Sequence, residues 1–194
     1  MEYLQRTRKK CCFVGDFGVG KTSIIFSYLS KSIEDIQTTL GIDFFSKTIR
    51  IKEQDLHLTI WDTAGSERFR SLLHSYLRDS DIIIIVYDLS KQNHNLTFWL
   101  RIAEQHQPNV LGILGNKSDL TQSCTNDLSD VLYPYERQKW NIIRGKCSSR
   151  DKKSIQVFMT KCLKKTIHNV AELPVKITPI KISKKKTGLS MCCV

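Results

Sequence analysis

The sequence has no long hydrophobic run, and this absence argues against a whole class of proteins. No stretch of its 194 residues approaches the roughly 20 apolar residues that a membrane-spanning helix needs. The opening segment, MEYLQRTRKK, lacks the apolar centre of a signal peptide. We therefore expect the protein to be made and kept on the cytosolic side of the membrane.

The sequence also lacks the cysteine spacing of a disulfide framework or a zinc site. Its seven cysteines include two adjacent pairs, and no two of them form a C-x-x-C motif. This odd count and this spacing fit neither kind of site, so we expect reduced thiols.

Net positive charge is small over most of the chain, although the total net charge is +11. From Arg150 onward there are eleven Lys and Arg residues against two Asp and Glu residues, which leaves about +2 for the first 149 residues. A nucleic-acid-binding face needs basic residues spread over a folded surface, so we expect no nucleic-acid partner.

Strand-like and helical patterns alternate along the chain. Residues 81–88 and 109–116 are near-continuous apolar runs, as in strands buried on both faces of a parallel sheet. Other strand-like runs occupy 10–15, 42–51 and 56–61. Helical patterns occupy 23–31, 96–106 and 154–170. Pro134 interrupts a further helical stretch, and NIIRGKC, 141–147, is a poor strand. The alternation predicts a three-layer α/β domain.

The segment GDFGVGKT, 15–22, has the pattern G-x-x-x-x-G-K-S/T between a strand and a helix. Its glycines let backbone N–H groups surround a phosphate chain at a helix N-terminus. Lys21 is expected to reach the terminal phosphates, and the Thr22 hydroxyl is expected to bind Mg²⁺. Asp62, directly after the strand LTIW, fits the acid that holds the metal through its water shell.

The segment NKSD, 116–119, follows a buried strand and indicates which base is bound. The Asp119 carboxylate can accept hydrogen bonds from N1–H and the exocyclic amine of guanine, whereas adenine would present an unpaired acceptor to it. A buried carboxylate facing an acceptor is costly, so this site predicts GTP rather than ATP.

The chain resembles the Rab family of small GTPases over roughly residues 10–165 and again at its last residues. The matching segments are TLGIDF (39–44), LTIWDTAG (58–65), ERFRSLLHSYLRDS (67–80) and VYDLS (86–90). GIDFFSKT and RSLLHSYLRDS look closest to the Rab-six branch of Golgi traffic regulators. The resemblance implies a P-loop NTPase fold, with a mostly parallel six-stranded sheet, one antiparallel strand and about five helices. It also implies an N-terminal extension (1–9), a GTPase domain (10–171) and a flexible basic tail (172–194).

The same resemblance assigns site residues. The nucleotide is expected to contact Gly15, Gly18, Val19, Gly20, Lys21, Thr22, Ser23, Thr39, Gly65, Asn116, Lys117, Asp119, Ser148, Ser149 and Arg150. Mg²⁺ is expected at Thr22, Thr39 and Asp62, and catalysis involves Lys21, Thr39, Gly65 and Ser66. Effectors are expected to read an aromatic surface of Phe44, Trp61 and Tyr76.

Four departures from the family pattern concern the nucleotide site. Ser66 stands where the family carries a glutamine, so we expect slow hydrolysis. Phe17 is bulky where relatives have a small or polar residue, and Arg150 replaces a lysine. The segment between Thr22 and Thr39 is one residue shorter than in close relatives, and Ile33 is the apolar residue left to cover the base edge.

The chain ends in MCCV, which has two cysteines and follows a Lys-rich segment. A C-a-a-X box needs its cysteine fourth from the end, where Met191 stands, so that pattern fails. The pair Cys192 and Cys193 resembles the Rab ending that receives two geranylgeranyl groups. Two lipid chains with Lys184, Lys185 and Lys186 would anchor the protein stably to an anionic surface.

These observations predict a monomeric GTP/GDP switch in vesicle traffic, on the cytoplasmic face of an internal membrane such as the Golgi or transport vesicles, and also in the cytosol. The implied partners are effectors, an exchange factor, a GTPase-activating protein, and chaperones of the Rab escort and GDP-dissociation-inhibitor types. Two alternatives remain open: a nucleotide-locked adaptor that does not hydrolyse GTP, and a P-loop ATPase or kinase, which Asn116 and Asp119 oppose.

Overall fold

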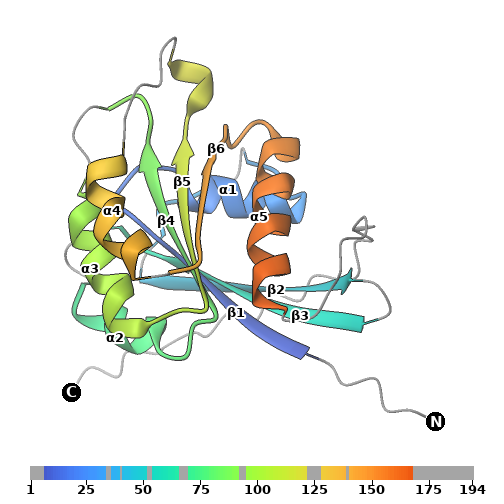
Figure 1. Ribbon diagram of the computed structural model, residues 1–194. Helices are drawn as coiled ribbons and strands as arrows, with labels where there is room; N and C mark the ends of the chain where they lie inside the picture. The colour runs from blue at the N-terminus through green and yellow to red at the C-terminus, as the bar shows by residue number, and fades with distance from the viewer. Residues whose placement is uncertain are drawn as a thin grey trace, which may run out of the picture.

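A six-stranded sheet forms the centre of the molecule (Figure 1). The computed structural model describes residues 7–33, 36–39, 41–51, 54–65, 70–91, 95–121, 128–138 and 140–167. The strands run in the order β2-β3-β1-β4-β5-β6, and only β2 and β3 pair in antiparallel fashion. They are β1 (Thr7–Val14), β2 (Ile42–Ile51), β3 (Gln54–Thr63), β4 (Ile82–Asp88), β5 (Val110–Asn116) and β6 (Ile142–Lys146).

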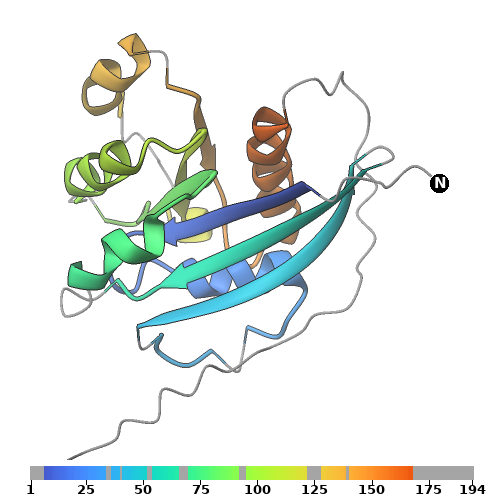
Figure 2. The same ribbon diagram turned by 90° about the horizontal axis from the view of Figure 1, so that it is seen from below.

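Helices cover both faces of the sheet and bury two separate apolar clusters. On one face lie α1 (Lys21–Leu29) and α5 (Lys152–Thr166), and on the other α2 (Arg70–Leu77), α3 (Leu96–His106) and α4 (Ser129–Arg137), as Figure 2 shows. Neighbouring residues of β4 point into opposite clusters, Ile84 to the α1/α5 side and Ile83 to the other. This explains why β4 reads as an unbroken apolar run. The predicted three-layer α/β fold is confirmed.

Two elements differ from the sequence pattern, each for a local reason. β6 forms although its segment is a poor strand, because an edge strand pairs on one side only and needs no unbroken apolar run. The helix α4 continues through Pro134, which the pattern treats as an interruption. Pro134 is exposed, so the bond to Asp130 that its missing N–H forfeits faces solvent rather than the core.

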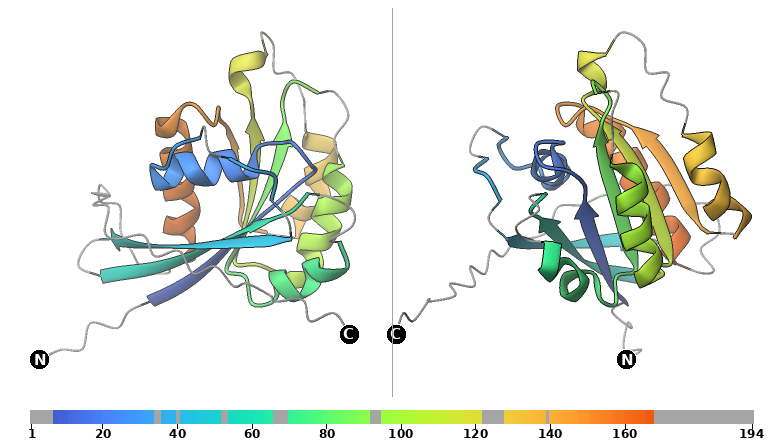
Figure 3. Two further views of the ribbon diagram at one scale, coloured as in Figure 1. Left: turned by 180° about the vertical axis from the view of Figure 1, so that it is seen from behind. Right: turned by 90° about the vertical axis from the view of Figure 1, so that its left-hand side faces the viewer.

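The carboxyl ends of the parallel strands meet at one edge of the sheet, toward which their arrowheads point at the top of the right-hand view of Figure 3. The loops after β1, β4, β5 and β6 leave from this edge, and β3 ends there as well. In open α/β sheets ligands bind at this edge. No helix among the described residues has both the length and the apolar character to cross a bilayer.

Candidate nucleotide-binding site

The loop between β1 and α1 wraps a pocket at the carboxyl edge of the sheet. Gly20 precedes the first residue of α1 with φ of 94°, a left-handed conformation that favours glycine. A Cβ on Gly20 would lie 2.3 Å from Nδ2 of Asn116, so no larger residue fits. The pocket has a volume of about 240 Å³. Its walls are Phe17, Gly18, Gly20, Lys21, Thr22, Ser23, Ile36, Gln37, Thr38, Thr39, Thr63, Ala64 and Gly65.

Lys21 is held under the loop by backbone carbonyls. Its Nζ donates to the oxygen of Gly15 at 2.9 Å and to that of Asp16 at 3.0 Å. The residue is 6% exposed, and burial lowers the pKa of Lys21 to about 8, against the opposing effects of Asp62 and Asp16. A polyanion in the pocket would stabilise the charged ammonium, and this position is compatible with the predicted role of Lys21.

The predicted metal ligands Thr22, Thr39 and Asp62 come together. The Thr22 hydroxyl donates to Oδ2 of Asp62 at 2.6 Å and lies 2.9 Å from the Thr39 hydroxyl, which lies 3.3 Å from the same carboxylate oxygen. The other carboxylate oxygen, Oδ1 of Asp62, is buried and has no hydrogen-bond partner among the described residues. Burial raises the pKa of Asp62 to about 6, although the hydrogen bond from Thr22 opposes this rise.

These three residues fit Mg²⁺. Hydroxyl and carboxylate oxygens are the ligands that this hard cation prefers, and a cation would satisfy the unpaired Oδ1 of Asp62. It would also offset the cost of burying a carboxylate that is 0% exposed. The polar side of the pocket is therefore built for a divalent cation next to phosphates.

Gly65 packs directly on the phosphate loop. A Cβ at this position would lie 2.5 Å from the backbone nitrogen of Phe17 and 2.5 Å from the carbonyl carbon of Asp16. Gly65 thus lines the pocket beside the phosphate loop. Phe17 lies at the mouth of the pocket and is 64% exposed.

Asn116 connects the two loops that flank the base position. Its Nδ2 donates to the carbonyl of Val19 at 2.8 Å, and its Oδ1 accepts from the backbone N–H of Ser149 at 3.0 Å. The residue is 1% exposed. Both ends of this side chain are therefore engaged by the protein, and Asn116 holds the phosphate loop to the segment after β6.

Asp119 presents an exposed carboxylate at the predicted base site. It lies in a short 3-10 helix, Ser118–Leu120, and its Oδ2 is 3.8 Å from Nη1 of Arg150. A hydrogen bond with the Ser148 side chain lowers the pKa of Asp119, which keeps the group ionised. An ionised, accessible carboxylate can accept the two hydrogen bonds that guanine offers.

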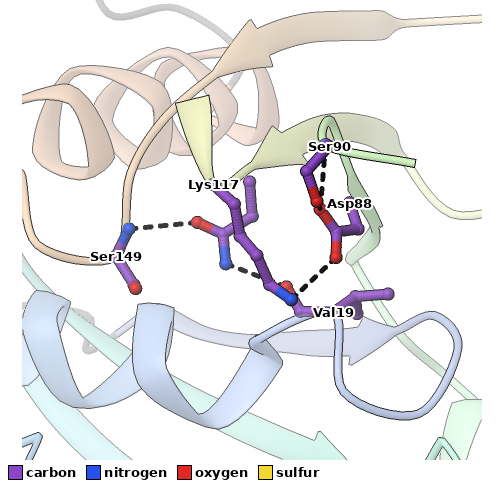
Figure 4. Close-up of polar contacts among 6 residues, drawn as sticks. Val19, Asp88, Ser90, Lys117 and Ser149 are labelled. Atoms are coloured by element: carbon purple, nitrogen blue, oxygen red, sulfur yellow. Dashed lines mark hydrogen bonds and ion pairs between the residues drawn. The ribbon is translucent and has the colours of Figure 1, made fainter. Parts of the chain in front are cut away.

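Lys117 makes a contact that the sequence motif does not specify (Figure 4). Its Nζ forms an ion pair with Oδ2 of Asp88 at 2.7 Å. Asp88 is 2% exposed and also accepts from the Ser90 backbone N–H at 3.0 Å and hydroxyl at 2.6 Å. Burial alone would raise the pKa of Asp88, but the hydrogen bonds from Lys117 and Ser90 outweigh it and lower the pKa.

Asp16 is a second residue that sequence reasoning missed. Although it lies in the phosphate loop, its carboxylate turns to α3, where Oδ1 accepts from Nε1 of Trp99 at 2.9 Å and Oδ2 from Nδ2 of Asn95 at 3.2 Å. Asp88 could have been suspected, because it ends a buried strand as Asp62 does. The partners of Asp16 lie 79 and 83 residues away and leave no signal in the sequence.

The three predicted effector residues form one aromatic row on β2, β3 and α2. The ring centroids of Phe44 and Trp61 are 6.1 Å apart, and those of Trp61 and Tyr76 are 6.4 Å apart. All three are half-buried, and Nζ of Lys10 lies 4.3 Å from the centroid of Trp61. The row is thus an accessible apolar surface with a cation beside it.

Several predicted residues lie outside the described ranges. These are Ser66, the basic residues Lys184, Lys185 and Lys186, and the terminal pair Cys192 and Cys193. Ile33 is half-exposed at the end of the segment after α1.

The arrangement agrees with what the chain is similar to. A family model described as the Ras family matches residues 10–172. The Ras-related protein RABC2b of Arabidopsis thaliana is 42% identical over 116 residues, which is 57% of this chain and 57% of that protein. The chain therefore spans little more than half the length of this curated relative. A match over residues 10–172 covers most of the sequence, and the chain belongs to the Ras family of small GTPases, whose members bind GTP or GDP with Mg²⁺.

Proposed function

We propose that the protein is a Rab-type GTP/GDP switch that recruits effectors to an internal membrane in its GTP state. The observation that carries this proposal is the cluster of Thr22, Thr39 and Asp62, with one buried carboxylate oxygen unpaired beside Lys21. Thr39 comes from the segment before β2, whereas Thr22 and Asp62 belong to the fixed frame of α1 and β3. A ligand that draws these oxygens together orders that segment, which is how a γ-phosphate is sensed.

The phosphate side of the site works through positioning and charge. Burial lowers the pKa of Lys21 and so disfavours its charged form. A bound anion would offset this cost of burying the ammonium group. The loop N–H groups and the N-terminus of α1 add fixed dipoles directed at the same anion. Bound Mg²⁺ would supply charge neutralisation between phosphate oxygens.

Base selection rests on Asp119. Its carboxylate is ionised and accessible, and Asn116 fixes the loops on either side of it. A site built to accept hydrogen bonds from guanine leaves this carboxylate unpaired against adenine, so it rejects ATP strongly. This argument opposes the ATPase or kinase alternative.

Hydrolysis in this protein is slow because Ser66 replaces the glutamine that orients the attacking water. Serine can hydrogen-bond a water, but its side chain is too short to hold one in line with the γ-phosphate. Rab activators bring both an arginine and a glutamine, so Ser66 does not lock the switch in its GTP state. A permanently loaded adaptor remains the alternative, and the exposed Phe17 at the pocket mouth favours it.

The aromatic row and the C-terminal tail support the proposed partners and the proposed membrane attachment. The row of Phe44, Trp61 and Tyr76 supports effector binding. We expect the segment before β2 to become ordered when GTP binds. An exchange factor, a GTPase-activating protein and escort or GDP-dissociation-inhibitor chaperones complete the cycle of a prenylated monomer. We place the protein on Golgi or transport-vesicle membranes and, between cycles, in the cytosol.

The test is nucleotide identity. Protein purified without added nucleotide is denatured, and its released ligand is identified by chromatography; we expect GDP or GTP and no adenine nucleotide. The variant Asp119→Asn is expected to lose affinity for GDP and gain affinity for xanthosine diphosphate, which offers an acceptor in place of the amine. Asp130→Asn, on the exposed first turn of α4, is the matched control. Equal competition by GTP and ATP for the unmutated protein would contradict the proposal.

A further inference from the structure

The contact between Lys117 and Asp88 places a buried carboxylate behind the base-binding motif. Lys117 follows the end of β5, and Asp88 is the last residue of the neighbouring strand β4. The register aligns Asp88 with Asn116, so the ion pair joins the ends of two adjacent parallel strands (Figure 4). The carboxylate is thus fixed by the sheet rather than by a loop.

The backbone at Lys117 adopts an uncommon conformation that this contact helps to hold. Lys117 has φ of 62°, in the left-handed region, which costs a non-glycine residue roughly 1–2 kcal/mol. That conformation directs the side chain back along the sheet edge to Asp88, at 2.7 Å. The Lys117 backbone is therefore strained in the conformation that places its ammonium group beside Asp88.

Asp88 is itself held in place on its other side. Ser90 donates to Oδ1 of Asp88 from both its backbone N–H and its hydroxyl, while Lys117 uses Oδ2. Both carboxylate oxygens are therefore engaged, and the residue is 2% exposed. A carboxylate with this many donors keeps a single orientation, which a free surface carboxylate does not.

We propose that Asp88 is a positioning residue for the guanine base: it holds the Lys117 side chain in the one orientation that covers the base. This inference rests on the proposed function, because it takes the base site as given and names what fixes one wall of it.

The experiment measures release of the fluorescent N-methylanthraniloyl derivative of GDP, chased with excess GDP at fixed Mg²⁺ and without an exchange factor. Asp88→Asn keeps the shape of the side chain and removes its charge, and we expect roughly tenfold faster release, the scale of one charge-assisted hydrogen bond. Lys117→Met is expected to accelerate release at least as much. The double variant is expected to release no faster than Lys117→Met alone, because Asp88 acts through Lys117.

Two further variants keep the inference falsifiable. Ser90→Ala removes one donor but leaves the ion pair, so a smaller acceleration of about two- to threefold is expected even if Asp88→Asn folds poorly. Asp81→Asn is the matched control, since Asp81 precedes the same strand and pairs with Lys9 at 2.8 Å, at the end away from the nucleotide. Its release rate is expected to match that of the unmutated protein.

The outcomes separate this inference from the function on which it rests. Additive effects of Asp88→Asn and Lys117→Met, or equal acceleration by Asp81→Asn, would mean that Asp88 supports the fold generally, and would overturn the inference. An unchanged release rate for Asp88→Asn in a protein that binds the fluorescent GDP tightly would do the same. Failure of the unmutated protein to bind it would instead overturn the proposed function.

Discussion

Lys47 is a buried cation on the α1 side of the sheet, in strand β2. It is 7% exposed, its Nζ donates to the carbonyl of Tyr28 at 2.9 Å, and the same atom lies 4.0 Å from the centroid of the Tyr28 ring. Burial lowers the pKa of Lys47 to about 8, and the nearby charge of Lys152 lowers it further. Burial in the folded protein therefore disfavours the charged form of Lys47, whereas a surface lysine has no such cost.

This depressed pKa predicts a pH-dependent stability. In the unfolded chain the pKa of Lys47 is 10.5, so between pH 8 and 10.5 the unfolded state holds more protons at this site and the free energy of unfolding rises with pH. We expect the unmutated protein to gain roughly 1–2 kcal/mol relative to Lys47→Met between pH 7 and pH 10. Urea unfolding of both proteins at equal GDP concentration measures this difference. Parallel pH profiles would show that Lys47 titrates normally.

In the proposed cycle, Ser66 is expected to limit the rate of GTP hydrolysis. Because positioning is most of phosphoryl-transfer catalysis, intrinsic hydrolysis is expected on the order of 10⁻⁴ s⁻¹ or below. Ser66→Gln restores a side chain that can reach the water and is expected to raise the single-turnover rate several-fold, with GDP affinity nearly unchanged. Ser66→Ala is the control and should behave like the unmutated protein. An ordinary family rate for the unmutated protein, unaffected by Ser66→Gln, would mean that another group positions the water.

At the scale of residues, the sequence predicts those whose role depends on local spacing. Lys21 and Thr22 reach the pocket because a glycine loop leads directly into a helix, and that geometry follows from eight consecutive residues. Asp88 and Asp16 act through partners 29 and 83 residues away, and such contacts exist only once strand order and register are known. Asn116 is predicted to contact the nucleotide, and its hydrogen bonds to Val19 and Ser149 add a role in joining loops that the motif does not specify.

Among the elements, α5 packs on the sheet partly through one aromatic side chain, Phe158. The ring of Phe158, which is 3% exposed, rests on Gly145 of β6 and Gly112 of β5. A Cβ on Gly145 would lie 2.4 Å from the ring, and one on Gly112 would lie 3.1 Å from it. These two glycines therefore form a recess that receives the ring.

The recess predicts a graded packing defect. Gly145→Ala forces the Phe158 ring to move and is expected to lower the free energy of unfolding by about 1–3 kcal/mol. Gly112→Ala is expected to cost less, since its contact is longer. Denaturant unfolding at saturating GDP measures both effects. Adding Phe158→Leu to Gly145→Ala should recover part of the loss, and a fully additive double variant would contradict steric overlap as the cause.

The elements themselves were predicted where burial is strong on both faces, as in β4 and β5, or where the apolar spacing is regular, as in α3. Prediction weakens toward the periphery. β1 begins at Thr7 rather than at residue 10, because its pairing with β3 continues past the apolar run. The sequence also predicts α4 and β6 poorly, because elements near the edge of the sheet need a less regular apolar pattern.

At the scale of the whole molecule, the net positive charge is concentrated from Arg150 onward, in α5 and in the tail of residues 172–194. The tail lies beyond α5, so its modification should not disturb the nucleotide site. Replacing Cys192 and Cys193 with Ser is expected to move the protein from membranes to the cytosol with unchanged nucleotide binding. Replacing Lys184, Lys185 and Lys186 should only weaken attachment and make it more sensitive to salt. Cell fractionation measures the membrane-bound fraction of both variants. An unchanged membrane-bound fraction of the double cysteine variant would contradict the proposal of a lipid anchor.

The hydrogen bond between Trp99 and Asp16 gives the molecule an intrinsic optical reporter. Trp99 is 2% exposed, whereas Trp61 and Trp140 are only partly buried, so a soluble quencher reaches those two indoles first. The remaining emission comes from a ring whose Nε1 is bonded to a carboxylate of the phosphate loop. Rearrangement of that loop changes the electric field at the indole, and the colour of its fluorescence therefore follows the state of the loop without an attached dye.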